Sequence, residues 1–330
     1  YDSKKSGGIT ISDLRFGHTP IRSTYLINMA DFVSCSTQSY VRRYDMMRTL
    51  KPNGTFLLNC KWTDEELEQE LPAEMKRYIA NNNIKFCTID AVTIAANLGL
   101  GNRTNTVLQS AFFKLANVLP IDDAVKYMKD AIVSSYGSKG EDIVNMNFAA
   151  VDAGLEHVHE VQVPEAWKTA PDDEKVDRLA TDFVVEIADK MNAQQGGDLP
   201  VSAFIDNADG TFPAGTTQYE KRGIANTIPI WLPENCIQCN QCSYVCPHGV
   251  IRPFLMTEEE AAELPESAAV VDGMKPYNEY KYRIQLSALD CTGCASCVQT
   301  CPGRKGEKAL VLKPLEENLN EADNWDYLIS

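Results

Sequence analysis

Eight of the eleven cysteines in this 330-residue chain follow one spacing that occurs twice. The first copy consists of Cys236, Cys239, Cys242 and Cys246, followed by Pro247. The second consists of Cys291, Cys294, Cys297 and Cys301, followed by Pro302. Two-residue spacers in a tight loop let three thiolates face three irons of one cubane cluster. The spacing therefore predicts two [4Fe–4S] clusters.

The fourth cysteine of each copy, the one before proline, ligates the other cluster in proteins that carry two copies of this pattern. We therefore expect crossed ligand sets. One cluster would be held by Cys236, Cys239, Cys242 and Cys301, and the other by Cys291, Cys294, Cys297 and Cys246.

Structural zinc and disulfides are the alternatives for so many cysteines. Zinc sites use two cysteine pairs and have no use for four cysteines at this spacing with a trailing proline. Disulfide staples suit small secreted domains that lack a sufficient core, and this chain is much longer. Iron analysis distinguishes iron–sulfur clusters from zinc sites and disulfides, because two cubane clusters hold about eight irons per chain. The remaining Cys35, Cys60 and Cys87 lie near apolar runs and are expected to be buried, inert thiols.

Two short loops have the composition of phosphate-binding loops. Lys4 and Lys5 precede Ser6 and two glycines, but the order departs from a P-loop, and a solvated turn is the alternative. Residues 99–106 follow a predicted strand and begin a helix, which suits an anion at a helix N-terminus with Arg103 as the phosphate ligand. A glycine turn capped by Thr104 or Asn105 explains that second loop equally well.

The apolar pattern predicts an α/β domain with a parallel sheet. A strand over 55–59, a helix over 63–82 with a break at Pro72, and a strand over 84–90 form a βαβ unit. Thr63 and Glu66 are placed as a capping box at the start of that helix. Further expected elements are a strand at 23–27, helices at 37–50, 106–118, 122–135, 141–159 and 172–191, and an extended exit at 314–330.

These elements suggest three domains. We expect an α/β domain over 1–193, an irregular linker over 194–229, and an α+β two-cluster domain of the bacterial ferredoxin type over 230–330. The 44 residues between Cys246 and Cys291 exceed what a minimal two-cluster domain needs, so this module is expected to fit neighbouring domains.

The formal net charge is −15, which argues against nucleic acid as a partner. Residues 230–330 carry 15 acidic and 8 basic residues, so the cluster domain shares this acidity. The sequence has no run of about 18 apolar residues and no leader pattern at its start, so we expect neither membrane insertion nor export. It begins without methionine, as a piece of a longer protein would.

As an ordered set, these motifs resemble the pyruvate:ferredoxin (flavodoxin) oxidoreductase family. The resemblance covers nearly the whole chain and ends in the double cysteine pattern. It is carried by residues 3–10, 14–17, 20–27, 91–108, 148–152 and by Glu220-Lys221-Arg222-Gly223-Ile224-Ala225.

The resemblance implies a central fragment: a CoA-binding domain, a Glu-Lys-Arg linker domain and the two-cluster domain. It implies CoA contacts from Lys4, Lys5, Asn102, Arg103, Asn105 and Asn147. Thiamine diphosphate and a third [4Fe–4S] cluster would belong to domains that this sequence lacks, so the fragment alone is expected to be inactive.

The implied reaction is oxidative decarboxylation of pyruvate with CoA to acetyl-CoA in anaerobic metabolism. The two clusters would relay electrons to ferredoxin or flavodoxin. The implied partners are the remaining domains and a second copy in a homodimer, in the cytoplasm or a hydrogenosome-like organelle. A stand-alone electron-transfer subunit and a scaffold without CoA binding are the competing hypotheses.

Overall fold

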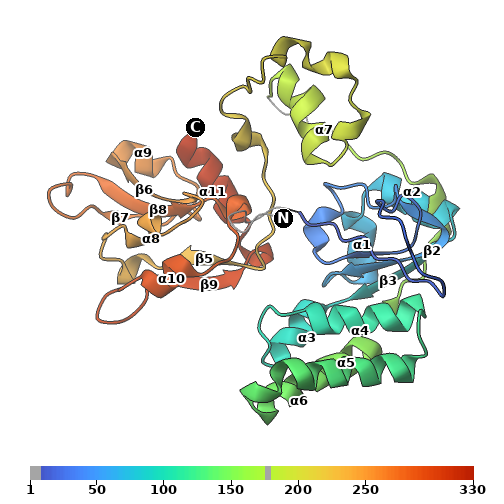
Figure 1. Cartoon of the computed structure of the whole chain (residues 1–330). Helices are drawn as coiled ribbons and strands as arrows, with labels where there is room; N and C mark the ends of the chain where they lie inside the picture. Colours follow the sequence, from blue (N-terminus) through green and yellow to red (C-terminus); the bar gives the residue numbers. More distant parts are fainter. Residues whose placement is uncertain (1–8, 175–179) are drawn as a thin grey trace. The chain divides into compact units, whose positions relative to one another are not determined.

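A computed structural model describes residues 9–174 and 180–330. The chain divides into two compact units, one over Ile11–Ala214 and the other built mainly from Gly215–Ser330 (Figure 1). In the described residues, the longest helices are too short or too polar to cross a lipid bilayer.

The first unit contains a four-stranded sheet in the order β1-β2-β3-β4. Strands β1 (Ala30–Cys35), β2 (Leu50–Asn59) and β3 (Lys85–Ile89) are parallel, and the two-residue β4 (His159–Glu160) is antiparallel at the edge. The predicted parallel α/β sheet is confirmed.

The chain before β2 differs from the prediction. Residues 23–27 form no strand, and Leu26 is 82% exposed, so pairing begins only at Ala30. The expected helix over 37–50 is one 3₁₀ turn (Gln38–Tyr40) followed by turns. The apolar residues behind that expectation are nevertheless buried, including Val41 and Met47. Packing into the core, rather than helix propensity, decides this segment.

The crossover between β2 and β3 follows the sequence closely. Helix α1 (Asp64–Glu70) and helix α2 (Ala73–Asn81) are separated at Pro72, as predicted. The capping box is present: the Glu66 N–H donates to Thr63 Oγ1 at 3.3 Å, and the Thr63 N–H donates to Glu66 Oε2 at 2.8 Å.

Helices α3 (Ala91–Asn97), α4 (Asn105–Ala116), α5 (Ile121–Tyr136) and α6 (Glu141–Glu156) follow β3. Helices α4 and α6 pack against each other across Gly154. A Cβ at this position would lie 2.3 Å from the Val107 carbonyl oxygen, so only glycine allows the close approach.

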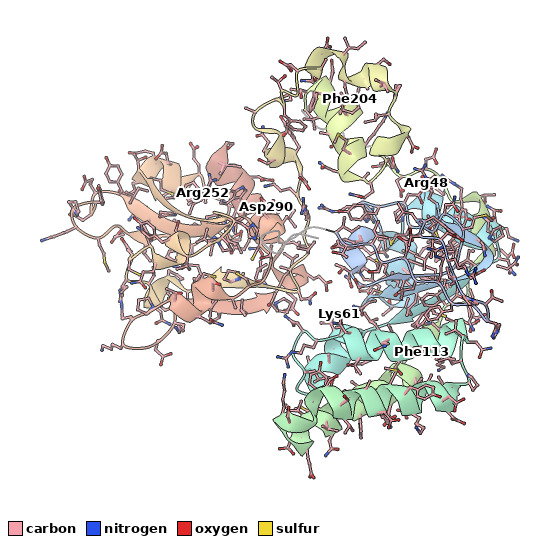
Figure 2. The ribbon with its side chains drawn as sticks, viewed as in Figure 1. Arg48, Lys61, Phe113, Phe204, Arg252 and Asp290 are labelled. Carbon is pink, nitrogen blue, oxygen red and sulfur yellow. The ribbon has the colours of Figure 1, made fainter. Side chains whose placement is uncertain are left out.

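The predicted helix over 172–191 is only partly within the described residues, which resume at 180. A π-helical turn (Val184–Ala188) leads into α7 (Asp189–Asn192). Arg48, labelled in Figure 2, donates from both terminal nitrogens to Asp198, at 2.6 and 2.9 Å.

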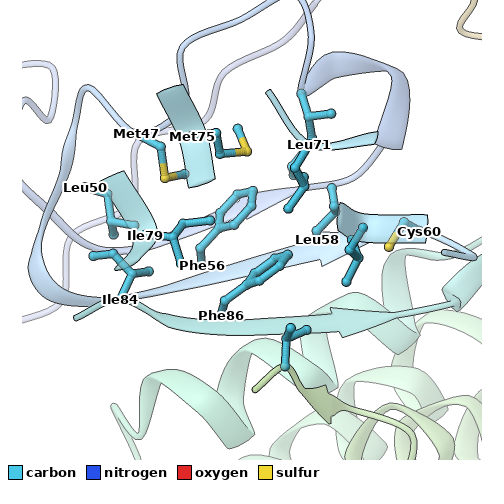
Figure 3. Close-up of a cluster of buried hydrophobic side chains, with 14 of the residues drawn as sticks. Met47, Leu50, Phe56, Leu58, Cys60, Leu71, Met75, Ile79, Ile84 and Phe86 are labelled. Atoms are coloured by element: carbon cyan, nitrogen blue, oxygen red, sulfur yellow. The ribbon is translucent and has the colours of Figure 1, made fainter. Parts of the chain in front are cut away.

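The main core of this unit lies between the sheet and α1–α2 (Figure 3). Phe56 of β2 and Phe86 of β3 stack with ring centroids 5.6 Å apart. Trp167 packs beside Phe86 and is 2% exposed, and its indole N–H donates to Glu68 of α1. Cys35 and Cys60 are buried in this core and Cys87 in the neighbouring one, as predicted.

The second unit combines two small antiparallel sheets with short helices. Strand β5 (Thr227–Trp231) pairs with β9 (Leu310–Pro314). The other sheet has the order β6-β8-β7, from Ile251–Met256, Lys281–Leu286 and Val271–Asp272. The helices are α8 (Gln241–Tyr244), α9 (Glu258–Ala262), α10 (Ser296–Thr300) and α11 (Asn320–Ile329). The expected extended exit at 314–330 is therefore wrong, because α11 occupies most of it and buries Trp325.

Candidate iron–sulfur centres

The two cysteine loops have the same backbone shape. Residues two and four positions after the first cysteine have positive φ in both copies: Gln238 (54°) and Asn240 (59°) in the first, Gly293 (71°) and Ala295 (63°) in the second. Residues other than glycine rarely adopt a positive φ. They do so where the surrounding structure enforces this backbone conformation. The repeat in sequence is thus a repeat in conformation, with α8 and α10 following the two loops.

Backbone N–H groups point at several of the cysteine sulfurs. The Gln238 N–H lies 3.4 Å from Cys236 Sγ, and the Gly293 N–H lies 3.4 Å from Cys291 Sγ. The Ala309 N–H approaches Cys301 Sγ at the same distance. Hydrogen bonds to thiolate sulfur favour its charged form and help to set a cluster's reduction potential.

One hollow in this unit is lined by four thiols from both copies of the pattern. Cys236, Cys239 and Cys242 of the first copy meet Cys301, the last cysteine of the second. The rest of the wall is mainly apolar and comes from Trp231, Ile237, Tyr282, Ile284, Ala309 and Leu310. This is the first of the two ligand sets predicted from the spacing, and we name it the first centre.

The thiols of the first centre act on one another electrostatically. Burial raises the pKa of Cys242 to about 11, and the nearby Cys236, Cys239 and Cys301 add to the rise. Such charge effects weaken with distance, so they agree with the position of the four thiols around one hollow. Burial also raises the pKa of Tyr282, whose hydroxyl donates to Asn240 Oδ1 at 2.6 Å.

The remaining four cysteines form a second group. Burial raises the pKa of Cys291, with further contributions from Cys246 and Cys294. Burial raises the pKa of Cys297 to about 12, and Cys291, Cys242 and Cys294 add to it. Cys246 also packs against the hydrophobic cluster that contains Cys291 and Cys297. The crossed assignment of Cys246 to the second copy stays a prediction. We name Cys291, Cys294, Cys297 and Cys246 the second centre.

The four thiols that line the first centre are the donor type that a [4Fe–4S] cluster needs. In the part of the chain that the structure describes, no three His, Cys, Asp or Glu side chains converge closely enough to hold one metal ion. A cubane cluster does not require such convergence, since each thiolate binds its own iron at a separate corner. The donor set and the apolar wall of the first centre fit this group.

The six predicted CoA contacts fall in different places. Lys4 and Lys5 lie outside the described residues. Asn102 and Arg103 are exposed in the loop that enters α4, and Asn105 is exposed as the first residue of that helix. Asn147 of α6 meets the same helix start, since the Thr106 hydroxyl donates to Asn147 Oδ1 at 3.4 Å. Asn147 is only 6% exposed, and its amide nitrogen donates to the Ile143 carbonyl oxygen.

The loop before α4 is built for a tight backbone. Gly99 and Gly101 have φ values of 78° and 60°, which glycine adopts without strain. The Thr104 side chain makes no capping hydrogen bond within the described chain. The first N–H groups of α4 therefore have no acceptor in the side chain of the N-cap residue, Thr104, which is the usual acceptor at a helix start.

A second hollow, of about 410 Å³, lies at the carboxyl ends of β2 and β3 and was not predicted from the sequence. Lys61, labelled in Figure 2, lies on its rim. His159 Nε2 and Asp64 Oδ1 are 2.9 Å apart at this site. The carboxyl edge of a parallel sheet is a common place for ligand binding. The βαβ pattern in the sequence could therefore have indicated a hollow at this edge.

Comparison with protein families covers most of the chain. Residues 1–157 match the family described as pyruvate ferredoxin/flavodoxin oxidoreductase, and residues 235–305 match the 4Fe-4S dicluster domain. Residues 169–225, between them, match the EKR family, described as a domain of unknown function. The chain belongs to the pyruvate ferredoxin/flavodoxin oxidoreductase family.

Individual relatives agree with this assignment. The pyruvate-flavodoxin oxidoreductase of Enterobacter agglomerans is 51% identical over 332 residues, covering 100% of this chain and 28% of the relative. The pyruvate:ferredoxin oxidoreductase of Moorella thermoacetica is 53% identical over 319 residues, covering 96% and 27%. The mitochondrial pyruvate dehydrogenase [NADP(+)] of Euglena gracilis is 43% identical over 333 residues, covering 100% and 18%. The chain thus spans under a third of the length of these relatives.

A solved structure, pyruvate oxidoreductase subunit PORC from Thermotoga maritima, matches 40% of this chain and 66% of its own. The TM-score is 0.33 and the sequence identity is 18%.

Proposed function

We propose that this chain is the electron-relay and CoA-docking part of a pyruvate:ferredoxin (flavodoxin) oxidoreductase. The observation that carries the proposal is the meeting of Cys301 with Cys236, Cys239 and Cys242 around one hollow. The reaction is oxidative decarboxylation of pyruvate with CoA, and the two centres pass its electrons one at a time to an acceptor protein. The 4Fe-4S dicluster family match supports the relay.

The chain's own residues prepare the first centre for a cluster, which would supply one-electron redox chemistry when bound. The four thiols provide the ligands, and the Gln238 and Ala309 N–H groups stabilise charge on two of the sulfurs. The apolar wall shields the buried Cys301 from water, which lowers the local dielectric and strengthens the hydrogen bond to its sulfur.

CoA binding is the second part of the proposal. CoA carries phosphates, and the start of α4 offers backbone N–H groups, the positive end of the helix dipole and the exposed Arg103. Lys4 and Lys5 add two positive charges in the sequence. The family match over residues 1–157 supports a substrate-handling role for this unit. The buried Asn147 would act by holding Thr106 and the start of α4 in place.

The acceptor and the setting are further proposals. The Enterobacter relative is named for flavodoxin and the Moorella relative for ferredoxin, so we propose a small ferredoxin or flavodoxin as acceptor. The Euglena relative is named for NADP(+) instead. The remaining domains of a longer, dimeric and cytoplasmic enzyme would supply the thiamine diphosphate site and a third cluster. Acting as a stand-alone electron-transfer subunit is the less favoured alternative.

Metal analysis of anaerobically prepared 330-residue chain tests the relay. We expect about eight irons and eight labile sulfides per chain, because two cubane clusters hold that number. Finding about two zinc ions instead would reject the iron–sulfur assignment. With pyruvate, thiamine diphosphate and CoA, the chain alone should not reduce ferredoxin. Turnover under those conditions would show that the thiamine site does not require other domains.

Calorimetric titration with CoA tests the docking role separately. We expect Arg103→Ala to weaken CoA binding about tenfold or more, because a charge-assisted hydrogen bond to phosphate is worth about 1.5–3 kcal/mol. Lys126→Ala, which removes an exposed cation from α5, is the matched control and should leave CoA affinity unchanged. Equal affinities for all three proteins would remove Arg103 from the CoA site.

A further inference from the structure

The Glu-Lys-Arg segment, residues 220–223, packs against the loop that leads into the second centre. Its neighbour there is residues 287–290, which directly precede Cys291; Asp290 is labelled in Figure 2. The family that includes this segment is described as a domain of unknown function. The contacts within the second unit suggest a function for it.

The shortest contact is an ion pair. Lys221 Nζ lies 2.5 Å from Asp290 Oδ2, and the two side chains are 25% and 28% exposed. The Ser287 hydroxyl also donates to Asp290 Oδ2, at 2.6 Å. The carboxylate next to the first ligand of the second centre is thus held from two sides.

The backbone of the segment adds a second connection. The N–H groups of Arg222 and Gly223 both donate to the Leu289 carbonyl oxygen, at 3.1 and 2.8 Å. Gly223 has a φ of 55°, a conformation that brings both N–H groups to one acceptor. The guanidinium of Arg222 is held in turn by Glu220, through an Nε–Oε1 bond of 2.7 Å.

The chain then continues over the cysteine loop itself. A Cβ on Gly293 would lie 3.1 Å from the Thr227 carbonyl oxygen and 3.5 Å from Ala225 Cβ, so this stretch lies directly on the loop. Ala225 is 5% exposed and shares one hydrophobic cluster with Cys291 and Cys297. The segment therefore covers the second centre's loop as well as pairing with it.

We propose that the Glu-Lys-Arg segment positions the second centre and sets its reduction potential through the Lys221–Asp290 pair. This inference rests on the proposed relay function. Reduction adds one negative charge to a cluster that four thiolates already make negative. A nearby cation stabilises the reduced form, and a nearby carboxylate opposes it. Lys221 therefore raises the reduction potential of the second centre and Asp290 lowers it. Because the two side chains form an ion pair, their effects on the potential partly cancel.

The test is an EPR-monitored redox titration of the full chain with both clusters bound. We expect Lys221→Met to lower one midpoint potential and Asp290→Asn to raise the same one. Each change should be at least about threefold in the reduction equilibrium constant, or about 28 mV, since tenfold is about 59 mV for one electron. The double variant should lie between the single variants, and Lys221→Arg should stay near the unaltered chain.

Lys313→Met is the matched control, because it removes an exposed cation from β9 of the same unit. Both potentials should stay unchanged in that variant. Loss of only the second cluster in Lys221→Met, with retention in Lys221→Arg, would also support the positioning role. Fully loaded variants with unshifted potentials, or shifts of the same sign, would overturn the inference. Failure of the unaltered chain to bind iron would instead overturn the proposed relay function.

Discussion

Individual residues define the two centres across a long sequence separation. Cys301 lies 59 residues from Cys242, yet both line the first centre. We predict that Cys301→Ser gives the same cluster loss as Cys242→Ser, and that Cys246→Ser gives the same loss as Cys297→Ser. Each variant should retain about four irons, since one cubane cluster remains.

The EPR spectrum of the remaining cluster identifies which one is lost. Cys87→Ala, a buried cysteine of the other unit, is the control and should retain about eight irons. If Cys301→Ser resembled Cys297→Ser instead, each centre would take its four ligands from one motif, and the crossed assignment would be wrong.

The buried thiols of the first unit make a prediction about pH. Burial raises the pKa of Cys35 and Cys87 from the usual 9.0 to about 11. A raised native pKa means that the folded state holds its proton more tightly than the unfolded state. The stabilisation is therefore complete below pH 9 and is lost as the pH rises toward 11. At pH 8 we expect both thiols to resist alkylation by iodoacetamide, measured by mass spectrometry.

Alkylation also has an internal comparison in the same chain. After iron removal, the exposed Cys239 and Cys294 should react at pH 8 within the time that leaves Cys35 and Cys87 unmodified. Hydrogen bonding by Ser296 lowers the pKa of Cys294, so this thiol should react first. Equal reactivity of all four would contradict the burial of the first unit's thiols.

Among the elements, α11 shows how one helix depends on one buried ion pair. Arg283 of β8 is 3% exposed and donates to Glu321 Oε2 at 2.9 Å. Gln285 donates to the same oxygen at 2.8 Å. Burial lowers the pKa of Arg283, while Glu321 opposes that shift, so removing the carboxylate leaves a buried cation without its partner.

We predict that Glu321→Ala lowers the free energy of unfolding by about 3–5 kcal/mol, the usual effect of breaking a buried pair. Denaturant unfolding of the chain with its clusters measures this change. Glu317→Ala, on an exposed residue just before the helix, should change the free energy by less than about 0.5 kcal/mol. Similar values for both variants would mean that the pair does not anchor α11.

At the scale of the whole molecule, the division into two compact units has a thermodynamic consequence. The thiols of both centres belong to the unit built mainly from Gly215–Ser330, whereas the parallel sheet belongs to Ile11–Ala214. Cluster binding stabilises only the state that presents the ligands. We predict that removing iron with a chelator makes the second unit easier to unfold and leaves the first unchanged.

Hydrogen exchange followed by mass spectrometry checks this prediction unit by unit. Peptides from β8 and β9 should lose protection after chelation, and peptides from β2 and β3 should keep theirs. The first unit serves as the control within the same sample. A parallel loss in both units would show that they unfold as one cooperative body.

The sequence alone determined the features that depend on local spacing. The cysteine spacing predicted the 4Fe-4S dicluster domain that the family match shows. The Thr63–Glu66 capping box and the break at Pro72 were visible because capping and proline geometry act within a few residues. The βαβ pattern predicted the parallel sheet, because a helix that connects two strands favours their parallel pairing.

Only the tertiary structure decided the features that depend on long-range contacts. Residues 37–50 are irregular, and Val41 and Met47 are buried in the core without a long helix. Helix α11 forms at 320–329, where Glu321 accepts a hydrogen bond from Arg283. The tertiary structure also joined Lys221 to Asp290, 69 residues away. A pattern along the chain carries no information on which charges meet, because packing sets those distances. The two cysteine motifs were therefore predicted, whereas the segment that covers the second centre was found only in the fold.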